Sequence, residues 1–337
     1  MYLGIFLGPW SRGPHDDHDV ISLCLDQAVE AAEAGFALVT FGEQHFNNYE
    51  PYCNPFLMGA RLSTHLKNAY FGTTIVPLPL HNPLRLAEDI NVLDVLTKGQ
   101  LIVGLSSGRV GHSRDFENFG ADPDRRHEMF ASKLEIIRKV WAKQAADPDL
   151  IFETDFDKGG VQGPGARMMP APYRRGGPLL AIGSNTDATN EHTGQMGLPM
   201  FLGPCPRDVA ARKFALYMSA LRQAGHPDEL VARNFHMSMV TKFLIVGETE
   251  DEARQRADRM TVGMLKMPPP GFEPIVGDPD SIVKELRAYE AAGVGQVQVR
   301  FTVGAGNHDD MRASFDLFVK ECLPALEPES FECPPRS

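Results

Sequence analysis

FGTTIVPLPLHNPLRLAEDINVLDVLTKGQLIVGLSSG, residues 71–108, reads as one strand–helix–strand unit. The run 69–76 is apolar and β-prone, Asn82–Thr97 is amphipathic, and 101–105 is again apolar. Both strand runs are continuously apolar rather than alternating, which is typical of a parallel sheet covered on both faces. The stretch therefore predicts an α/β fold.

The same alternation continues outward to both ends of the chain. The expected strands are 2–8, 37–41, 69–76, 101–105, 179–183, 199–203, 236–246 and 296–302. The expected helices include Val20–Gly35, Asn82–Thr97, Arg126–Lys143, Arg207–Gly225, Thr249–Leu265 and Asp280–Gly293, and several of them end at glycine.

Eight such units in 337 residues predict a single (β/α)8 barrel domain over residues 1–337. An open doubly wound sheet is the alternative, but GIFLGPWSRG at residues 4–13 lacks the G-x-G-x-x-G spacing of its first turn. Two Gly- and Pro-rich stretches, at about 145–178 and 263–279, are expected to be long insertions.

Composition narrows the class of protein. A net charge of −11 argues against a nucleic-acid or anionic-membrane partner, and no apolar run is long enough to cross a bilayer. The N-terminal stretch has no basic region before its apolar residues, so we do not interpret it as a signal peptide. The scattered cysteines Cys24, Cys53, Cys205, Cys322 and Cys333 suit a reducing cytoplasm better than a disulfide framework or zinc site.

Polar residues follow several of the expected strands. In a barrel, the catalytic groups come from the carboxyl ends of the strands. The segments at these ends are Glu43-Gln44-His45, Thr73-Thr74-Ile75, Ser106-Ser107-Gly108-Arg109 and Ser184-Asn185-Thr186. They are expected to converge on one rim of the barrel.

The residues 184–189 open a helix, where free backbone N–H groups can bind an anion. Plain N-capping of that helix is the alternative. Hydroxyls and the guanidinium of Arg109 after the preceding strand favour a phosphate.

His45 is a candidate general base because histidine is the side chain that ordinarily exchanges a proton near neutral pH, although a structural histidine at a strand end is the alternative. The cluster His15-Asp16-Asp17-His18-Asp19 is interpreted as a solvated loop, and no metal site is predicted. No Ser-His-Asp arrangement with a nucleophile elbow, HExxH motif or P-loop occurs. This profile suits an enzyme whose cofactor supplies the reactivity.

The stretch 71–108 resembles the core of bacterial luciferase and the wider luciferase-like flavin-dependent monooxygenases. It carries the pattern G-T…LP…P-x-R-x-A-E-D…L-D-x-L-(S/T)-x-G-(R/Q)…G. FGEQHF (41–46), AIGSNTDAT (181–189) and GLPM (197–200) fall in matching order. The resemblance covers roughly residues 1–205 and is looser beyond them.

The resemblance implies a (β/α)8 barrel that uses FMN, reduced by a separate NAD(P)H:flavin reductase, and dioxygen to oxygenate a small organic or natural-product substrate. It also implies a non-proline cis peptide at Thr74–Ile75 beside the flavin ring, and Ser106 in place of a reactive cysteine. The implied cofactor-binding residues are Thr73, Thr74, Ile75, Ser106, Ser107, Arg109, Arg126, Ser184, Asn185, Thr186 and Thr189. The implied catalytic residues are Glu43, Gln44, His45 and Ser106.

Two positions depart from the family pattern. Gln44 stands where the family has the histidine regarded as the general base of luciferase, and an amide cannot exchange a proton at neutral pH. A base must then be His45, another residue or the substrate itself. Ser107 stands at the position of the phosphate-binding arginine, for which Arg109, Arg125 or Arg126 are possible substitutes.

Two alternatives stay open: a deazaflavin-dependent hydride-transfer oxidoreductase of the same fold, and a non-catalytic flavin-binding homologue, which Gln44 and Ser107 keep open. Likeness to the family also suggests a homodimer formed through helices within 54–67 and 83–97, with Leu62 at the interface.

Overall fold

The computed structural model describes residues 1–109, 113–174, 176–260, 273–302 and 307–332. Within them, eight parallel strands form a closed barrel, as the sequence predicts. In order along the chain they are β1 (Tyr2–Phe6), β2 (Leu38–Phe41), β3 (Tyr70–Pro77), β4 (Leu101–Ser106), β7 (Leu179–Gly183), β8 (Met200–Leu202), β9 (Met239–Val246) and β11 (Gln296–Arg300).

Two strand pairings, β1 with β11 and β8 with β9, complete the barrel. The first and last barrel strands pair in parallel, with Ile5 opposite Val299. On the other side, Phe201 of β8 lies opposite Met239 of β9. A short additional strand, β10 (Ile275–Gly277), pairs with the outer half of β9 and lies within the insertion predicted at 263–279, of which residues 263–272 lie outside the described part.

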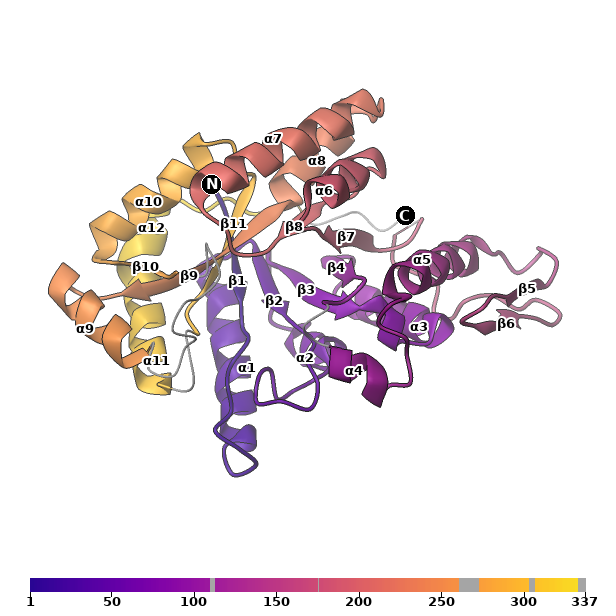
Figure 1. Ribbon diagram of the computed structural model, residues 1–337, viewed down its shortest axis with the longest axis horizontal. Coiled ribbons are helices and arrows are strands. Elements are labelled where there is room, and N and C mark those ends of the chain that lie inside the picture. The colour runs from indigo at the N-terminus through magenta and orange to yellow at the C-terminus, as the bar shows by residue number, and fades with distance from the viewer. Residues whose placement is uncertain (110–112, 175, 261–272, 303–306, 333–337) are drawn as a thin grey trace.

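Helices surround the strands (Figure 1). They are α1 (Asp17–Ala34), α2 (Pro55–Leu62), α3 (Pro83–Leu96), α4 (Ser113–Asn118), α5 (Arg126–Ala142), α6 (Asp187–Gln195), α7 (Arg207–Gln223), α8 (Asp228–Met237), α9 (Glu250–Met260), α10 (Pro279–Ala291), α11 (His308–Leu317) and α12 (Leu323–Leu326). A 3₁₀ turn, Leu78–Leu80, precedes α3, and a π-helical turn, Phe318–Cys322, joins α11 to α12.

Local sequence explains where several helices begin and end. Asn54 and Asn82 cap α2 and α3 by accepting backbone N–H bonds, and each is followed by a proline that suits the first helical turn. Gly35, with φ of 105°, ends α1 in the left-handed conformation that glycine adopts readily.

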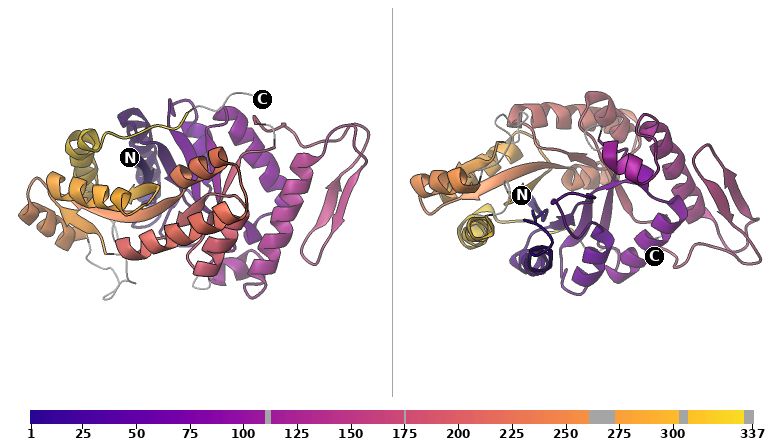
Figure 2. Two further views of the ribbon diagram at one scale, coloured as in Figure 1. Left: turned by 90° about the horizontal axis from the view of Figure 1, so that it is seen from above. Right: turned by 60° about the horizontal axis from the view of Figure 1, so that its bottom comes forward.

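The predicted insertion at 145–178 is not irregular throughout. Residues Leu150–Glu153 (β5) and Lys158–Val161 (β6) form an antiparallel hairpin, which extends away from the barrel beyond α5 (Figure 2). Lys133 of α5 donates to Asp157 of the hairpin at 2.8 Å, and both side chains are buried. That contact is tertiary, so composition alone does not reveal it.

A row of four polar side chains crosses neighbouring strands on the inner face of the barrel. Thr241 donates to the Gln298 oxygen at 2.9 Å, and the Gln298 amide donates to Thr40 at 2.7 Å. Thr74 donates to the same Thr40 hydroxyl at 2.8 Å. Because each buried group has a partner, the row joins β9, β11, β2 and β3 without leaving an unpaired polar atom among them.

Candidate active site

A cavity of about 270 Å³ opens at the carboxyl ends of the barrel strands. Residues that follow β2, β3, β4, β7 and β8, together with β9 and β11, form its wall. Its polar and charged lining residues are Glu43, Gln44, Glu50, Thr74, Ser106, Ser107, Arg109, Asp115, Asn185, Thr241 and Arg300. The rim predicted from sequence therefore exists as one cavity.

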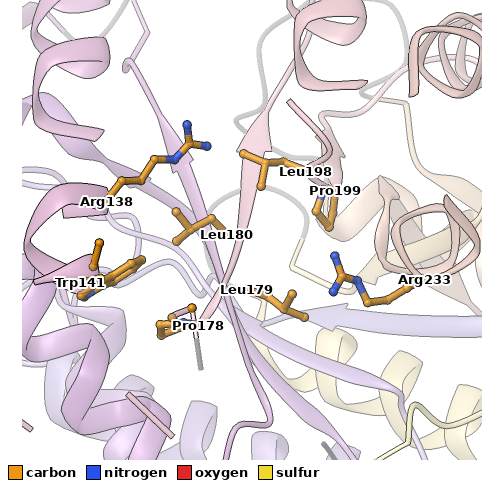
Figure 3. A pocket seen from close by; sticks show the side chains of 11 residues that line it. Arg138, Trp141, Pro178, Leu179, Leu180, Leu198, Pro199 and Arg233 are labelled. Carbon is orange, nitrogen blue, oxygen red and sulfur yellow. The ribbon is translucent and has the colours of Figure 1, made fainter. Parts of the chain in front are cut away.

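A second cavity, of about 430 Å³, lies at the opposite end of the barrel between α5 and α8 (Figure 3). Arg138 and Arg233 flank it, and Trp141, Leu179 and Pro199 are part of its wall. Leu179 begins β7 and Pro199 precedes β8, so this cavity belongs to the amino-terminal face, where barrels carry stability rather than chemistry. We therefore place the candidate active site in the smaller cavity.

The Thr74–Ile75 peptide bond is cis, which confirms that expectation. Both residues line the cavity. Two glycines make room behind them: a Cβ at Gly104 would overlap the backbone oxygen of Thr73, and one at Gly183 would overlap the Ile75 side chain. Close packing with two neighbouring strands thus determines where this part of the wall lies.

Glu43 is a buried carboxylate held by two histidines. His45 and His81 bring their Nε2 atoms to 3.0 Å and 2.7 Å from the same Glu43 oxygen. Burial alone would raise the pKa of Glu43, but these hydrogen bonds and the two imidazoles outweigh it and lower the pKa. Glu43 is therefore a stable anion that orients its neighbours.

His45 itself does not line the cavity; its ring packs edge-on against Phe119, with 4.7 Å between ring centroids. His81 contacts Glu43 from the turn after β3, and sequence reasoning assigned it no role. Only the folded loop brings residues 43 and 81 together, so no sequence spacing could have indicated the pair.

The predicted phosphate-binding residues divide into two groups. Ser106, Ser107, Arg109 and Asn185 line the cavity, and Arg109 has no ion pair with any residue in the described ranges. Ser184 is buried and donates to the Asn190 oxygen at 2.6 Å, with the Thr189 hydroxyl 2.9 Å away, while Thr186 and Thr189 cap α6 reciprocally. The plain capping alternative therefore describes Thr186 and Thr189 in this structure.

Two other predicted residues do not reach the cavity wall. Thr73 donates to the Gly104 oxygen at 3.1 Å and is fully buried. Arg126 donates to the Pro123 oxygen at 3.0 Å from the start of α5. Arg125, the other substitute considered, pairs with Glu128 and Asp155.

Sequence reasoning missed Glu50 and Arg300, which both line the cavity. Arg300 ends β11, donates to the Gly8 oxygen at 2.6 Å, and places its guanidinium 4.5 Å from the centre of the Phe6 ring. Burial raises the pKa of Glu50 to about 7. An arginine at the end of the last strand was a visible signal under the strand-end rule, whereas nothing in the loop sequence marked Glu50 as buried.

The rest of the cavity wall is apolar and rich in aromatic rings. Phe6, Phe116, Phe201, Phe243 and Met239 contribute to it. A flat, largely apolar ligand with an anionic group would fit this aromatic wall and an Arg109 that is unpaired within the described ranges, which is what FMN offers.

No group of three or more potential metal ligands occurs among the residues that the structure describes. In the His15–Asp19 segment, Asp16 pairs with Arg12 at 2.7 Å and His18 with Asp19 at 3.2 Å. None of the described helices has the length and apolar character that a membrane span needs.

The sequence matches the luciferase-like monooxygenase family over residues 1–272. The chain therefore belongs to this family, whose members are flavin-dependent monooxygenases.

Two relatives illustrate the range of the family. The alkanal monooxygenase alpha chain of the Kryptophanaron alfredi symbiont is 27% identical over 203 residues, which are 60% of this chain and 54% of the relative. The oxygenase component of the flavin-dependent trigonelline monooxygenase of Acinetobacter baylyi is 21% identical, with 89% of both chains covered. This chain spans only part of several relatives that it matches: 39% of an uncharacterised Sinorhizobium fredii protein, and 54% and 60% of two alkanal monooxygenase alpha chains.

Solved structures share the fold. Monooxygenase RslO1 from Streptomyces bottropensis superposes with a TM-score of 0.80 at 22% identity, covering 96% of this chain and 99% of that one. The oxygenating constituent of 3,6-diketocamphane monooxygenase from Pseudomonas putida, in complex with FMN, gives 0.77 at 20% identity over 98% and 99%. An F420-dependent secondary alcohol dehydrogenase gives 0.70 at 16% identity over 96% and 98%.

Proposed function

We propose that this protein is the oxygenase component of a two-component monooxygenase, which takes reduced FMN from a separate NAD(P)H:flavin reductase and oxygenates a small organic substrate with dioxygen. The observation that supports it is the cavity at the carboxyl ends of the strands. There Thr74, Ile75 and an aromatic wall adjoin Arg109, which makes no ion pair with any residue that the structure describes. Two relatives are described as oxygenating parts of such systems.

The residues present fit FMN. Arg109, Ser107 and Asn185 would bind its phosphate, since a guanidinium and nearby hydroxyl and amide donors suit phosphate oxygens. Thr74 and Ile75 would lie along the ring, with Ser106 beside it. When bound, reduced FMN supplies the electrons that activate dioxygen.

The chain's own contribution is positioning and water exclusion. The apolar residues Phe116, Phe201 and Phe243 keep one wall dry, and the hydrogen bond from Thr74 to Thr40 fixes the polar edge opposite. The Glu43 anion keeps His45 and His81 in place behind the wall. A dry, preorganised cavity protects a reactive oxygen donor from water.

The test is an anaerobic titration of the protein with reduced FMN, followed by exposure to air. We expect saturable binding and slower re-oxidation of bound than of free FMN. Arg109→Ala should weaken binding at least about tenfold, because a charge-assisted hydrogen bond contributes about 1.5–3 kcal/mol. Arg85→Ala, which removes an exposed α3 arginine paired with Asp89, is the control and should leave affinity unchanged. Absence of binding would refute the proposal.

A deazaflavin-dependent hydride transfer is the second candidate, since an F420-dependent dehydrogenase, whose cofactor is a deazaflavin, shares the fold. Titration with the reduced deazaflavin separates the two. Binding of the deazaflavin together with indifference to dioxygen would favour the second candidate.

We further propose that the protein works in the cytoplasm as a homodimer. On the neighbouring helices α2 and α3, large apolar side chains are exposed: Leu57 by 68%, Val92 by 44%, Val95 by 42% and Leu96 by 46%. Leu62 was expected at this interface, but it is 1% exposed and belongs to the core. That expectation was wrong because the helix turns Leu62 inward and Leu57 outward.

A further inference from the structure

Three carboxyl groups line the active-site cavity within the described ranges, and Glu50 differs from the other two. Glu43 is held by two histidines, and Asp115 is half-buried on α4. Glu50 is only 2% exposed, yet it makes no ion pair with any described residue. A buried carboxyl without a cation partner is costly when ionised.

The groups that face Glu50 come from several elements. The Gln44 amide, after β2, stabilises the ionised carboxyl and so lowers its pKa, and Arg300 of β11 and Glu43 act on it through their charges. Tyr52 and Cys24 are also close to Glu50, and the charge of Glu50 contributes to raising the pKa of each of them. Tyr52 donates to the Leu7 oxygen, and Cys24 lies on α1.

Arg300 is the nearby cation, but its hydrogen bonds go elsewhere. Its Nη2 atom donates to Gly8, and its buried Nε atom has no acceptor among the described residues. The cavity thus holds a buried acid and a buried guanidinium that are close but not paired.

The local backbone makes room for this carboxyl. A Cβ at Gly42 would overlap the Glu50 carboxylate, and one at Gly8 would lie 2.9 Å from it. Glu50 also has a φ of 53°, a left-handed conformation that is unfavourable for a residue other than glycine. Strain of this kind is characteristic of functional sites.

We propose that Glu50 is the proton-exchanging residue of this cavity: it passes its carboxyl proton to, and takes it back from, an oxygen or nitrogen atom of the small molecule bound against it. In the forward transfer the Glu50 O–H bond breaks, an O–H or N–H bond forms on the ligand, and a carboxylate remains facing Arg300. Reversal with ligand or water restores the acid. The proposal rests on the proposed function only for the identity of that molecule.

The protonation equilibrium supports this role. Burial raises the pKa of Glu50 to about 7, against the lowering effects of the Arg300 charge and the Gln44 amide, while the Glu43 charge raises it further. A group that titrates near working pH can both give and take a proton. Gln44 cannot titrate, and His45 does not line the cavity. Glu50 therefore supplies the proton-exchanging side chain that is missing at position 44.

The first test uses the ligand-free protein with ¹³C-labelled glutamate side chains, titrated by NMR. We expect one glutamate with a midpoint near pH 7, which disappears in Glu50→Gln and persists in the control Glu88→Gln, whose side chain on α3 is half-exposed. Gln44→Leu should raise the midpoint by about one pH unit, a tenfold change in proton affinity. An ordinary midpoint in the unmodified protein would overturn the proposal.

The second test repeats the titration with oxidised FMN and then with reduced FMN. If FMN binds in this cavity, binding should shift the pH midpoint of the Glu50 titration by at least about one pH unit, because the ligand replaces water around the carboxyl group. An unchanged midpoint in the FMN-bound protein overturns the proposal while leaving FMN binding intact. Failure of FMN to bind refutes the proposed function, and the ligand-free titration still decides whether Glu50 exchanges its proton near pH 7.

Discussion

Glu50 carries an electrostatic cost that depends on pH. Its pKa is about 7 in the folded protein, against an ordinary value of 4.5. Between these two values the unfolded chain has released the proton while the folded protein keeps it. Glu50 therefore lowers the free energy of unfolding progressively as pH rises through this window.

Glu50→Gln should consequently stabilise the protein above about pH 7 and have little effect below about pH 4.5. The gain should grow by roughly 1.4 kcal/mol for each pH unit within the window. Urea unfolding at several pH values measures it.

Glu43→Gln is the matched comparison, because the pKa of Glu43 is lowered on folding. Its ionised form stabilises the fold above the ordinary pKa, and this contribution is lost as pH falls through the folded pKa. We expect Glu43→Gln to destabilise at pH 8. A stabilising effect of Glu43→Gln, or a destabilising one of Glu50→Gln at that pH, would contradict this account.

Gly104 and Gly183 lie behind the cis Thr74–Ile75 peptide, and different obstacles face their missing Cβ atoms. At Gly104 the obstacle is the Thr73 backbone, which cannot move without β3, so Gly104→Ala should cost about 3 kcal/mol of unfolding free energy. At Gly183 it is the tip of the Ile75 side chain, which can rotate, so Gly183→Ala should cost about 1 kcal/mol. Equal losses in thermal or urea unfolding would contradict this steric explanation.

At the scale of elements, the β5–β6 hairpin shows how an insertion is fastened to the barrel. Lys133 of α5 donates both to Asp157 and to the backbone oxygen of His81, at 2.8 Å and 2.9 Å. The same lysine therefore joins the hairpin to the turn that places His81 against Glu43.

Asp157→Ala should destabilise the protein by about 3 kcal/mol, because it leaves the Lys133 ammonium buried without its carboxylate. The control lies in the same hairpin: Lys158 pairs with Glu153 at 2.9 Å, but both side chains are more than two-thirds exposed. Lys158→Ala should change stability by less than about 0.5 kcal/mol. If both variants lose a similar amount of unfolding free energy in urea unfolding, the buried pair stabilises the protein no more than the exposed pair does.

Strands such as β2 and β4 were predicted well because their runs are apolar on both sides, and burial on both faces leaves that pattern in the sequence. The hairpin was not predicted because Gly159 and Gly160 weaken its β signal, and its attachment depends on a side chain of α5. Helix α2 was expected only as a dimerisation surface, and its inward and outward faces required the fold.

At the scale of the whole molecule, the exposed apolar side chains of α2 and α3 are where a second copy would bind. Leu57→Glu combined with Val92→Glu should convert the expected dimer to a monomer in analytical ultracentrifugation, because burying two carboxylates opposes association. Ile151→Glu is the control, since Ile151 is 66% exposed but lies on the β5–β6 hairpin rather than on α2 or α3. A dimer that persists in the double variant would exclude this surface.

The candidate site was predicted in outline. Glu43, Gln44, Thr74, Ile75, Ser106, Ser107, Arg109 and Asn185 line the cavity, as expected of strand ends. His45, Thr73, Arg126, Ser184, Thr186 and Thr189 do not line it, because each turns to a hydrogen-bond or packing partner that the sequence does not show.

The sequence by itself determined the barrel and the rim on which polar residues gather, since both follow from the period and order of apolar runs along the chain. Only the tertiary structure decided which of those polar groups share one cavity and how each is protonated. Glu50 and Arg300 approach one another because β11, which carries Arg300, pairs with β1, and the Glu50 backbone N–H donates to the Pro9 oxygen just after β1. Burial and proximity across such a closure depend on contacts between distant segments, and no local pattern records them.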